Sequence, residues 1–201
     1  MIENIGGIFL SLLKSLELTI MKNVILVSLV ALIVTGCASA PPIDFTVQDV
    51  GMVSQRKNAE LRSLTVGYAT QVQQKKVQSG YAIPGIWKEA LTDAINRSLV
   101  FRDGSDKTVN LSVRITEVDT PEMGFAMTTK VAAIYEIIDR NNGDLLMAEE
   151  VRSEGVVPMD YSLIGVTRAV ESLNRAVRNN IAEFISRLEG VDLDKPVFRG
   201  N

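Results

Sequence analysis

The fold is decided by residues 131–151, which read VAAIYEIIDRNNGDLLMAEEV. Two runs rich in β-branched and other apolar residues, 131–139 and 145–151, flank a short polar segment. Runs of this kind on either side of Asn-Gly predict a β-hairpin. Asn142 and Gly143 supply the positive φ angles that a type I′ turn needs, at low energetic cost. We therefore expect two adjacent antiparallel strands here.

Further elements are predicted by the spacing of apolar residues on both sides of this hairpin. Alternation over 109–116 predicts a strand covered on one face, and β-forming residues over 43–47 and 61–68 predict two more strands. Apolar residues recur at helical spacing over 84–99 and over 166–188. Each of these two helices therefore has one apolar stripe to bury.

The helix ends are predicted from turn and capping residues. Pro84-Gly85 begins the first helix, and the polar turn 102–106 ends it. Asp160 or Ser162 can cap the start of the last helix, and Gly190 is placed to end it. The predicted order is two strands, a helix, three strands and a helix. It predicts an α+β fold, a two-layer sandwich with a mainly antiparallel sheet of about five strands and two helices on one face.

A secretory leader is predicted upstream of this domain. Lys22 and Asn23 follow Met21, and the uncharged run 24–36 then leads to Cys37. A basic start followed by an apolar run and small residues is typical of a signal peptide. The run has 13 residues, whereas about 20 are needed to cross a bilayer as a helix. It is therefore too short for a permanent membrane span.

The end of this leader resembles the lipobox of bacterial lipoproteins, at Val34, Thr35, Gly36 and Cys37. The resemblance implies that a signal peptidase recognises the first three residues and cleaves after Gly36. It also implies conversion of the Cys37 thiol to a diacylglyceryl thioether and acylation of the new amino terminus, for example with palmitate. Ala38, where Asp would signal inner-membrane retention, implies the outer membrane and its periplasmic face. The alternative is a free Cys37 buried at the end of a core strand, because free Cys is among the most buried residue types.

These signals divide the chain into five parts. Residues 1–20 lack the positive bias of a signal-peptide start. They either precede a true translation start at Met21 or form an amphipathic leader. The remaining parts are a lipoprotein signal peptide over 21–36, a lipidated tether over 37–42, a single α/β domain over 43–190, and a flexible tail over 191–201.

Composition excludes several classes of function. The chain has 21 Lys and Arg against 24 Asp and Glu, a net charge of −3, no His and one Cys. This charge gives no field suited to nucleic acid, and a His-based triad, a His-ligated zinc and an intrachain disulfide are impossible. Glu149 and Glu150 point to opposite faces of a strand, so they are expected to be solvated rather than to act as a catalytic pair. We predict no catalytic residue, no metal ligand, and no cofactor apart from the acyl lipid on Cys37.

One connection contains a candidate partner contact. Met123, Phe125 and Met127 lie in the segment 121–127, which Pro and Gly interrupt and where a solvated loop would be polar. Met side chains suit adaptable contacts. The same residues are also expected if the segment begins the next strand, with Phe125 and Met127 on its buried face. Both interpretations stay open at this point.

Two further features have a functional and a structural interpretation. Arg168, Arg175 and Arg178 are expected with Glu171 on the outer face of the last helix, where they could meet an anionic lipid headgroup or a glycan. Mixed charges on an exposed helix face are more often solvated ion pairs. Trp87 could anchor an interface, but its place in the apolar stripe favours the core.

The lipobox followed by this element order is similar to small periplasmic lipoproteins of the YajG and LpoB type, and to the amino-terminal domain of curli-secretion lipoproteins. The lipobox, the single domain and the lack of a catalytic constellation indicate a lipid-anchored, non-catalytic envelope protein. It would act as an accessory or assembly subunit, binding another envelope protein or a second copy of itself. The alternative is a periplasmic carrier of a lipid or peptidoglycan fragment, which needs an apolar cavity of roughly 300 Å³ or more.

Overall fold

The structure, a computed structural model, describes residues 21–22, 41–70, 76–77, 82–122 and 124–200. Its strands are β1 (Glu60–Tyr68), β2 (Lys76–Val77), β3 (Thr108–Asp119), β4 (Met127–Asp139) and β5 (Leu145–Val157). Its helices are α2 (Ile83–Ser98), α3 (Gly165–Gly190) and a short 3₁₀ helix at Met159–Tyr161.

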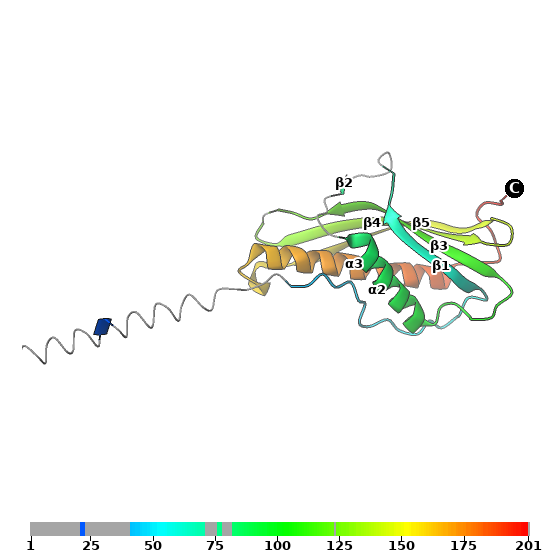
Figure 1. The fold of residues 1–201 in the computed structure, drawn as a ribbon, viewed down its shortest axis with the longest axis horizontal. Helices are drawn as coiled ribbons and strands as arrows, with labels where there is room; N and C mark the ends of the chain where they lie inside the picture. Colours follow the sequence, from blue (N-terminus) through cyan, green and yellow to red (C-terminus); the bar gives the residue numbers. More distant parts are fainter. Residues whose placement is uncertain (1–20, 23–40, 71–75, 78–81, 123, 201) are drawn as a thin grey trace, which may run out of the picture. The chain divides into compact units, whose positions relative to one another are not determined.

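The strands form one sheet in the order β1–β3–β4–β5, and β2 also pairs with β3. β1 and β2 run parallel to β3, whereas β3, β4 and β5 are antiparallel neighbours. α3 packs against β4 and β5, and α2 packs against β1, both on the same face of the sheet (Figure 1). The predicted α+β sandwich with a mainly antiparallel sheet and two helices is confirmed.

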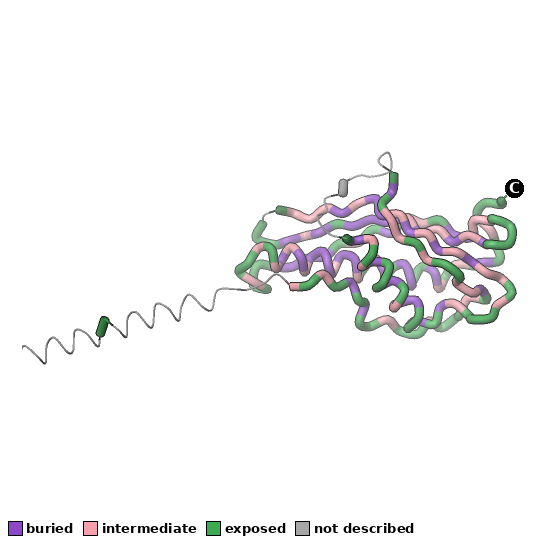
Figure 2. Tube along the Cα trace, in the orientation of Figure 1, coloured by how far each residue is buried: buried purple, intermediate pink, exposed green. Residues whose placement is uncertain are grey.

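The core lies between the sheet and the helices. Every second residue of β3 from Val109 to Ile115 is buried, because alternate side chains of a strand point to the covered face. Buried positions follow α3 and the central strands, whereas β1 has only half-buried and exposed residues (Figure 2). Trp87 is fully buried, which confirms its place in the core. Its ring packs edge to face against that of Phe45, with the two ring centroids 6.4 Å apart.

The hairpin is confirmed, but its turn is not the type I′ turn that Asn142-Gly143 predicts. Gly143 has a φ of +77°, and Leu99 is the only described non-glycine residue with a positive φ. Asn142 therefore lacks the conformation that a type I′ turn requires at both central positions. The Gly143 amide donates instead to the carbonyl oxygen of Asp139 at 2.9 Å. The longer loop that results needs one left-handed residue, and the glycine provides it.

No strand forms over 43–47, so that prediction is wrong. The segment is extended and lies along α3, where the Asp44 amide donates to Oδ1 of Asn174 at 3.1 Å. Phe45 and Val47 are buried while their neighbours are exposed. Successive side chains of any extended segment point to opposite sides, whether the segment pairs in a sheet or packs singly on helices. The alternation therefore indicates one-sided burial without a strand partner.

The helix ends also differ from the predictions. α2 stops where Leu99 adopts a left-handed conformation with φ +55°, before the turn at 102–106. Ile164 is the N-cap residue of α3 and gives no side-chain cap, so neither Asp160 nor Ser162 caps this helix. The Ser162 hydroxyl accepts a hydrogen bond from the Ile164 amide at 3.1 Å instead. A local serine turn thus forms before the helix and uses the hydroxyl.

α3 ends at Gly190, as predicted. The sequence predicts a flexible tail beyond it, and residues 191–200 run back to the β4–β5 hairpin. The Leu145 amide donates to the carbonyl of Phe198, and the Val197 amide donates to the carbonyl of Leu145, both at 2.8 Å. The end of the chain thus pairs with the start of β5.

Candidate functional site

β1 is an edge strand whose outer side has no described neighbour. The Ala69 amide donates to the carbonyl of Ile115 in β3 at 2.9 Å. Because amides alternate in direction along a parallel ladder, those of Thr65 and Gly67 also face β3. Those of Leu64 and Val66 then point away from the sheet. In the part of the chain that the structure describes, no strand pairs with this side of β1.

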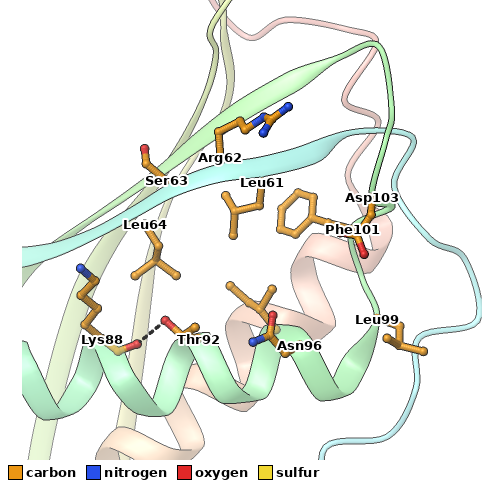
Figure 3. A pocket seen from close by; sticks show the side chains of 11 residues that line it. Leu61, Arg62, Ser63, Leu64, Lys88, Thr92, Asn96, Leu99, Phe101 and Asp103 are labelled. Carbon is orange, nitrogen blue, oxygen red and sulfur yellow. Dashed lines mark hydrogen bonds between the residues drawn. The ribbon is translucent and has the colours of Figure 1, made fainter.

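A groove runs beside this edge, between β1 and α2 (Figure 3). Its volume is about 650 Å³. Apolar side chains from both elements and from the segment after α2 form its floor, and polar side chains form its rim. The floor consists of Leu61, Leu64, Ile95, Leu99 and Phe101, and the rim of Arg62, Ser63, Lys88, Thr92, Asn96 and Asp103.

The groove exists because α2 presents a polar row to β1. Lys88, Thr92 and Asn96 are spaced four residues apart, so they lie along one line of the helix. The Thr92 hydroxyl donates to the carbonyl of Lys88 at 2.7 Å, and it therefore turns toward its own helix (Figure 3). Leu61 and Leu64 face this row and stay half-buried, although Ile95, Leu99 and Phe101 also line the groove. A space beside the strand is left unfilled.

A bulge in β1 sets which side chains line the groove. The pairing with β3 shifts between Leu61 and Ser63, and Arg62 is the additional residue. A bulge bends its strand and redirects the side chains that follow. Arg62 pairs with Glu60 at 3.3 Å, whereas no described carboxylate pairs with Lys88 on the opposite rim. The groove therefore offers an apolar floor with one positive charge, Lys88, and one negative charge, Asp103, on its rim.

Sequence reasoning missed this site, although two signals for it are present. The apolar residues of 61–68 break their alternation at Arg62 and Ser63, which is the mark of a bulge. The polar row of α2 adjoins the apolar stripe of the same helix. Neither signal shows that the bulged strand and the polar row face each other.

The residues of the predicted lipidation site, Val34, Thr35, Gly36 and Cys37, lie outside the described residues, and so does Met123. Among the residues that the structure does describe, no helix combines the length and apolar character needed to cross a bilayer. The lipobox therefore stays a prediction.

The two interpretations of the segment 121–127 each apply to a different residue. Met127 is the first residue of β4 and is buried, as expected of the start of a strand. Phe125 is 83% exposed. Met127 thus belongs to the core, and Phe125 keeps the exposure that a partner contact requires.

Arg168 does not lie on the outer face of α3, where the sequence predicts it. It is buried, and its guanidinium donates to the carbonyl oxygens of Ser162 and Gly124. The loops before α3 and before β4 pass over the first turn of the helix and enclose this side chain. Arg175 and Arg178 stay at the surface and both pair with Glu171, at 2.9 and 3.7 Å.

The two adjacent glutamates are separated by the sheet, as predicted. Glu149 pairs with Arg187 of α3, at 3.4 Å, on the covered side. Glu150 pairs with Arg152, at 2.5 Å, on the other side. Within the described residues, no group of three or more His, Cys, Asp or Glu side chains could hold a metal ion. These carboxylates therefore form no common site.

Comparison with known proteins adds similarity of fold only. No protein-family model matches the sequence, and no curated protein is significantly similar to it. Among solved structures, a protein from Xanthomonas campestris is similar with a TM-score of 0.48 and 12% identity, over 75% of this chain and 94% of that chain. A minor lipoprotein from Acinetobacter baumannii has a TM-score of 0.41 and 10% identity, over 68% and 94% of the two chains. The PelC dodecamer from Paraburkholderia phytofirmans has a TM-score of 0.41 and 13% identity, over 76% and 93%. Function is therefore argued from the residues of this chain.

Proposed function

We propose that this chain is a lipid-anchored, non-catalytic protein of the bacterial cell envelope that binds an extended segment of a partner protein. The observation that carries this proposal is the edge of β1 at Leu64 and Val66, beside which no described strand lies, together with the adjacent groove. A segment that adds to the sheet as a further strand would pair its backbone with β1 and place alternate side chains in the groove. Only an extended polypeptide can pair its backbone with the β1 edge and at the same time place side chains in the groove.

The chemistry of the groove indicates which segments fit. The amides of Leu64 and Val66 point outward and can pair with a backbone of any sequence. The floor, which includes Leu61 and Phe101, favours apolar side chains at alternate positions. Lys88 on the rim favours an acidic residue next to them, since opposite charges across an interface help to fix its register. A segment with apolar residues at alternate positions and an acidic residue near Lys88 is the expected partner.

The proposed anchor is the lipid on Cys37. Pro41, the first described residue of the domain, follows Cys37 by four residues, which span at most about 14 Å. The domain would then stay close to the outer membrane on its periplasmic side. Its partners would be membrane proteins or long periplasmic segments, and anchoring would raise their effective concentration.

Crosslinking tests the binding site. A photoreactive amino acid replaces Ser63 on the groove rim or, as a control, Glu154 on β5 at the opposite edge of the sheet. We expect a reproducible protein adduct in the envelope from position 63 and none from position 154. The same experiment with Val66→Pro removes an outward amide, and the adduct should be lost while circular dichroism shows an intact fold. An adduct that persists with Val66→Pro would contradict strand addition.

Mass spectrometry tests the anchor separately. The mature protein should begin at Cys37 and have the added mass of a diacylglyceryl group and an acyl chain. A Cys37→Ala variant should keep the domain but leave the membrane fraction. A bare thiol with the leader still attached would refute the anchor and leave the groove to be tested on its own.

A small apolar ligand is the second candidate for the same groove. Its volume of about 650 Å³ exceeds the roughly 300 Å³ that such ligands need. A carrier would be favoured if a lipid or peptidoglycan fragment copurifies with the native protein. The Thr92→Leu variant, whose larger side chain would fill the groove, should then lose this fragment. A protein partner is favoured if the crosslinked adduct at position 63 forms in the wild-type background and is lost with Val66→Pro.

A further inference from the structure

The segments before β4 and before α3 lie together at the end of the domain where α3 begins (Figure 1). Several of their large apolar residues are exposed. Phe125 is 83% and Leu163 is 89% exposed. Exposed large apolar residues that gather in one place mark contact with a membrane or another protein. We call this surface the apolar end, and it consists of Phe125, Met159, Tyr161, Leu163, Ile164 and Val166.

The apolar end is held together by a buried arginine. Arg168 is only 6% exposed and lies in the first turns of α3. Its guanidinium donates to the carbonyl of Gly124, at 3.1 Å, and to the carbonyl of Ser162. In sequence, Gly124 is followed by Phe125 and Ser162 by Leu163. The polar backbone of both loops therefore faces inward, while the apolar side chains of the next residues face outward.

A second contact fixes another part of this surface. The Arg175 guanidinium lies 5.4 Å from the centre of the Tyr161 ring and donates to the carbonyl of Val156 at 2.9 Å. Arg175 also pairs with Glu171, so it adds no free positive charge. Asp160 and Glu122 are exposed nearby in the sequence. The apolar end therefore has no excess of positive charge that would select anionic headgroups.

The start of the described domain leads toward the apolar end. The carbonyl of Pro42 accepts from Asn174 at 3.2 Å, and the carbonyl of Asp44 accepts from Arg178 at 3.1 Å. The chain thus runs toward the start of α3 as its residue numbers fall. Asn174 lies nine residues beyond the start of α3, a distance of about 14 Å along the helix. The residues between Cys37 and Pro42 can span about 17 Å, which is long enough to bring Cys37 to the apolar end.

We infer that the apolar end inserts into the surface of the bilayer that carries the lipid anchor. The inference rests on the proposed lipidation of Cys37. An anchor within reach of six exposed apolar side chains brings them to the headgroup boundary, where apolar side chains enter about 5–10 Å deep. Tyr161 suits this position because its ring is apolar and its hydroxyl is polar. The inserted surface fixes the orientation of the domain, with the β4–β5 turn pointing away from the membrane.

Fluorescence quenching tests this inference on the lipidated full-length protein in phosphatidylcholine vesicles. Leu163→Trp places a reporter in the apolar end, and Phe198→Trp is the matched control because Phe198 is exposed beside the distant hairpin. Both variants retain the buried Trp87 as a common background. With brominated acyl chains, we expect most of the emission added by Leu163→Trp to be lost and that added by Phe198→Trp to be unchanged.

The outcomes separate this inference from the proposed anchor. If lipid is detected on Cys37 but neither reporter loses emission in brominated vesicles, the inference is wrong. The proposed anchor is then still supported. A Leu163→Trp reporter that is shielded from water but unquenched, in protein that sediments as a complex, assigns the surface to a protein and also overturns it. If Cys37 has no lipid, the anchor fails, and quenching after vesicles are added to the unanchored protein then decides the inference.

Discussion

The two edges of the sheet, β5 and β1, differ in how the rest of the described chain covers them. At the β5 edge, side chains of α3 bind the backbone carbonyls: Asn179 donates to Glu154 at 2.8 Å and Arg175 donates to Val156 at 2.9 Å. The tail pairs with the start of this strand at Leu145. At the β1 edge, no hydrogen bond joins the described side chains of α2 to the strand, and a groove separates them. Other parts of the chain close the β5 edge, whereas no described strand pairs with the outer side of β1.

The interiors beside the two edges also differ. Several buried polar groups between α3 and the sheet are paired with one another. The Tyr135 hydroxyl donates to Asn180 at 2.9 Å, and the hydroxyls of Thr129 and Ser172 share a hydrogen bond of 2.6 Å. Proteins usually protect sheet edges against pairing with other chains. The β1 edge beside the apolar groove is the surface that we propose for a partner segment.

The largest effect is expected where β5 and α3 approach most closely, at Gly155. A Cβ added there would overlap the backbone oxygen of Ser172 and the backbone nitrogen of Ala176. Gly155→Ala should therefore lower the free energy of unfolding by about 3 kcal/mol, because neither backbone can yield easily. Gly67→Ala in β1 is the control, since nothing lies within 4 Å of its Cβ position. Urea denaturation that showed equal losses would remove the distinction between the two edges.

The next largest effect is expected at the buried hydrogen bond of Tyr135. Asn180 accepts from the Tyr135 hydroxyl and donates to the carbonyl of Val151 at 2.9 Å. Asn180→Ala leaves both groups buried without a partner, which should reduce the free energy of unfolding by about 2 kcal/mol. Asn96→Ala, the same change on the groove side of α2, should have almost no effect. A large loss for Asn96→Ala would show that the open half also contributes to stability.

Most strands and helices could be predicted because each buries one face against the same core, which leaves a regular spacing of apolar residues in its own sequence. The alternation that begins at Val109 and the helical spacing over 166–188 are properties of one segment, and the structure confirms both. The segment 43–47 has the same alternation, and it packs on helices without a strand partner. Alternation measures burial on one side, so it cannot distinguish these two cases.

The candidate site could not be predicted because it depends on distant segments meeting. Arg168 has the sequence context of an exposed residue, and it is buried because loops that contain Gly124 and Ser162 cross it. The outward direction of the Leu64 amide depends on a bulge at Arg62. A bulge of one residue changes the direction of every following amide. The lipobox is a local motif that needs no tertiary contact, and it remains a prediction that mass spectrometry can test.

A smaller effect is expected from closing the open edge. Thr92→Leu puts an apolar side chain opposite Leu61 and Leu64 and removes only a hydroxyl bonded to its own helix. Filling such a space should raise the free energy of unfolding by about 1 kcal/mol. It should also reduce the crosslinked adduct at position 63. Glu89→Leu on the exposed side of α2 is the control, and a matching gain in stability there would show that helix propensity alone is responsible.

The smallest effect is expected in the pH dependence of stability in acid. It arises at the end of α3, where residues that precede β1 form hydrogen bonds to the helix. The Ser54 amide donates to Oε1 of Glu189 at 2.7 Å, and the Ser54 hydroxyl donates to the same atom. Hydrogen bonds from the Ser54 side chain and backbone hold the pKa of the Glu189 carboxyl below its ordinary value of 4.5. A lowered folded-state pKa adds stability above the unfolded pKa, and this stability is lost as the pH falls through the folded pKa.

Ser54→Ala should therefore raise the pKa of Glu189 toward its ordinary value, which a carboxyl NMR titration measures. The stability difference between variant and wild type should be present at neutral pH and vanish in acid. Lys57 lies beside the same helix end, and burial lowers its pKa. Ser63→Ala is the control at the open edge, because that hydroxyl binds Asn110, which does not titrate. A pH-dependent difference in the control as large as that of Ser54→Ala would mean that the linkage does not come from Glu189.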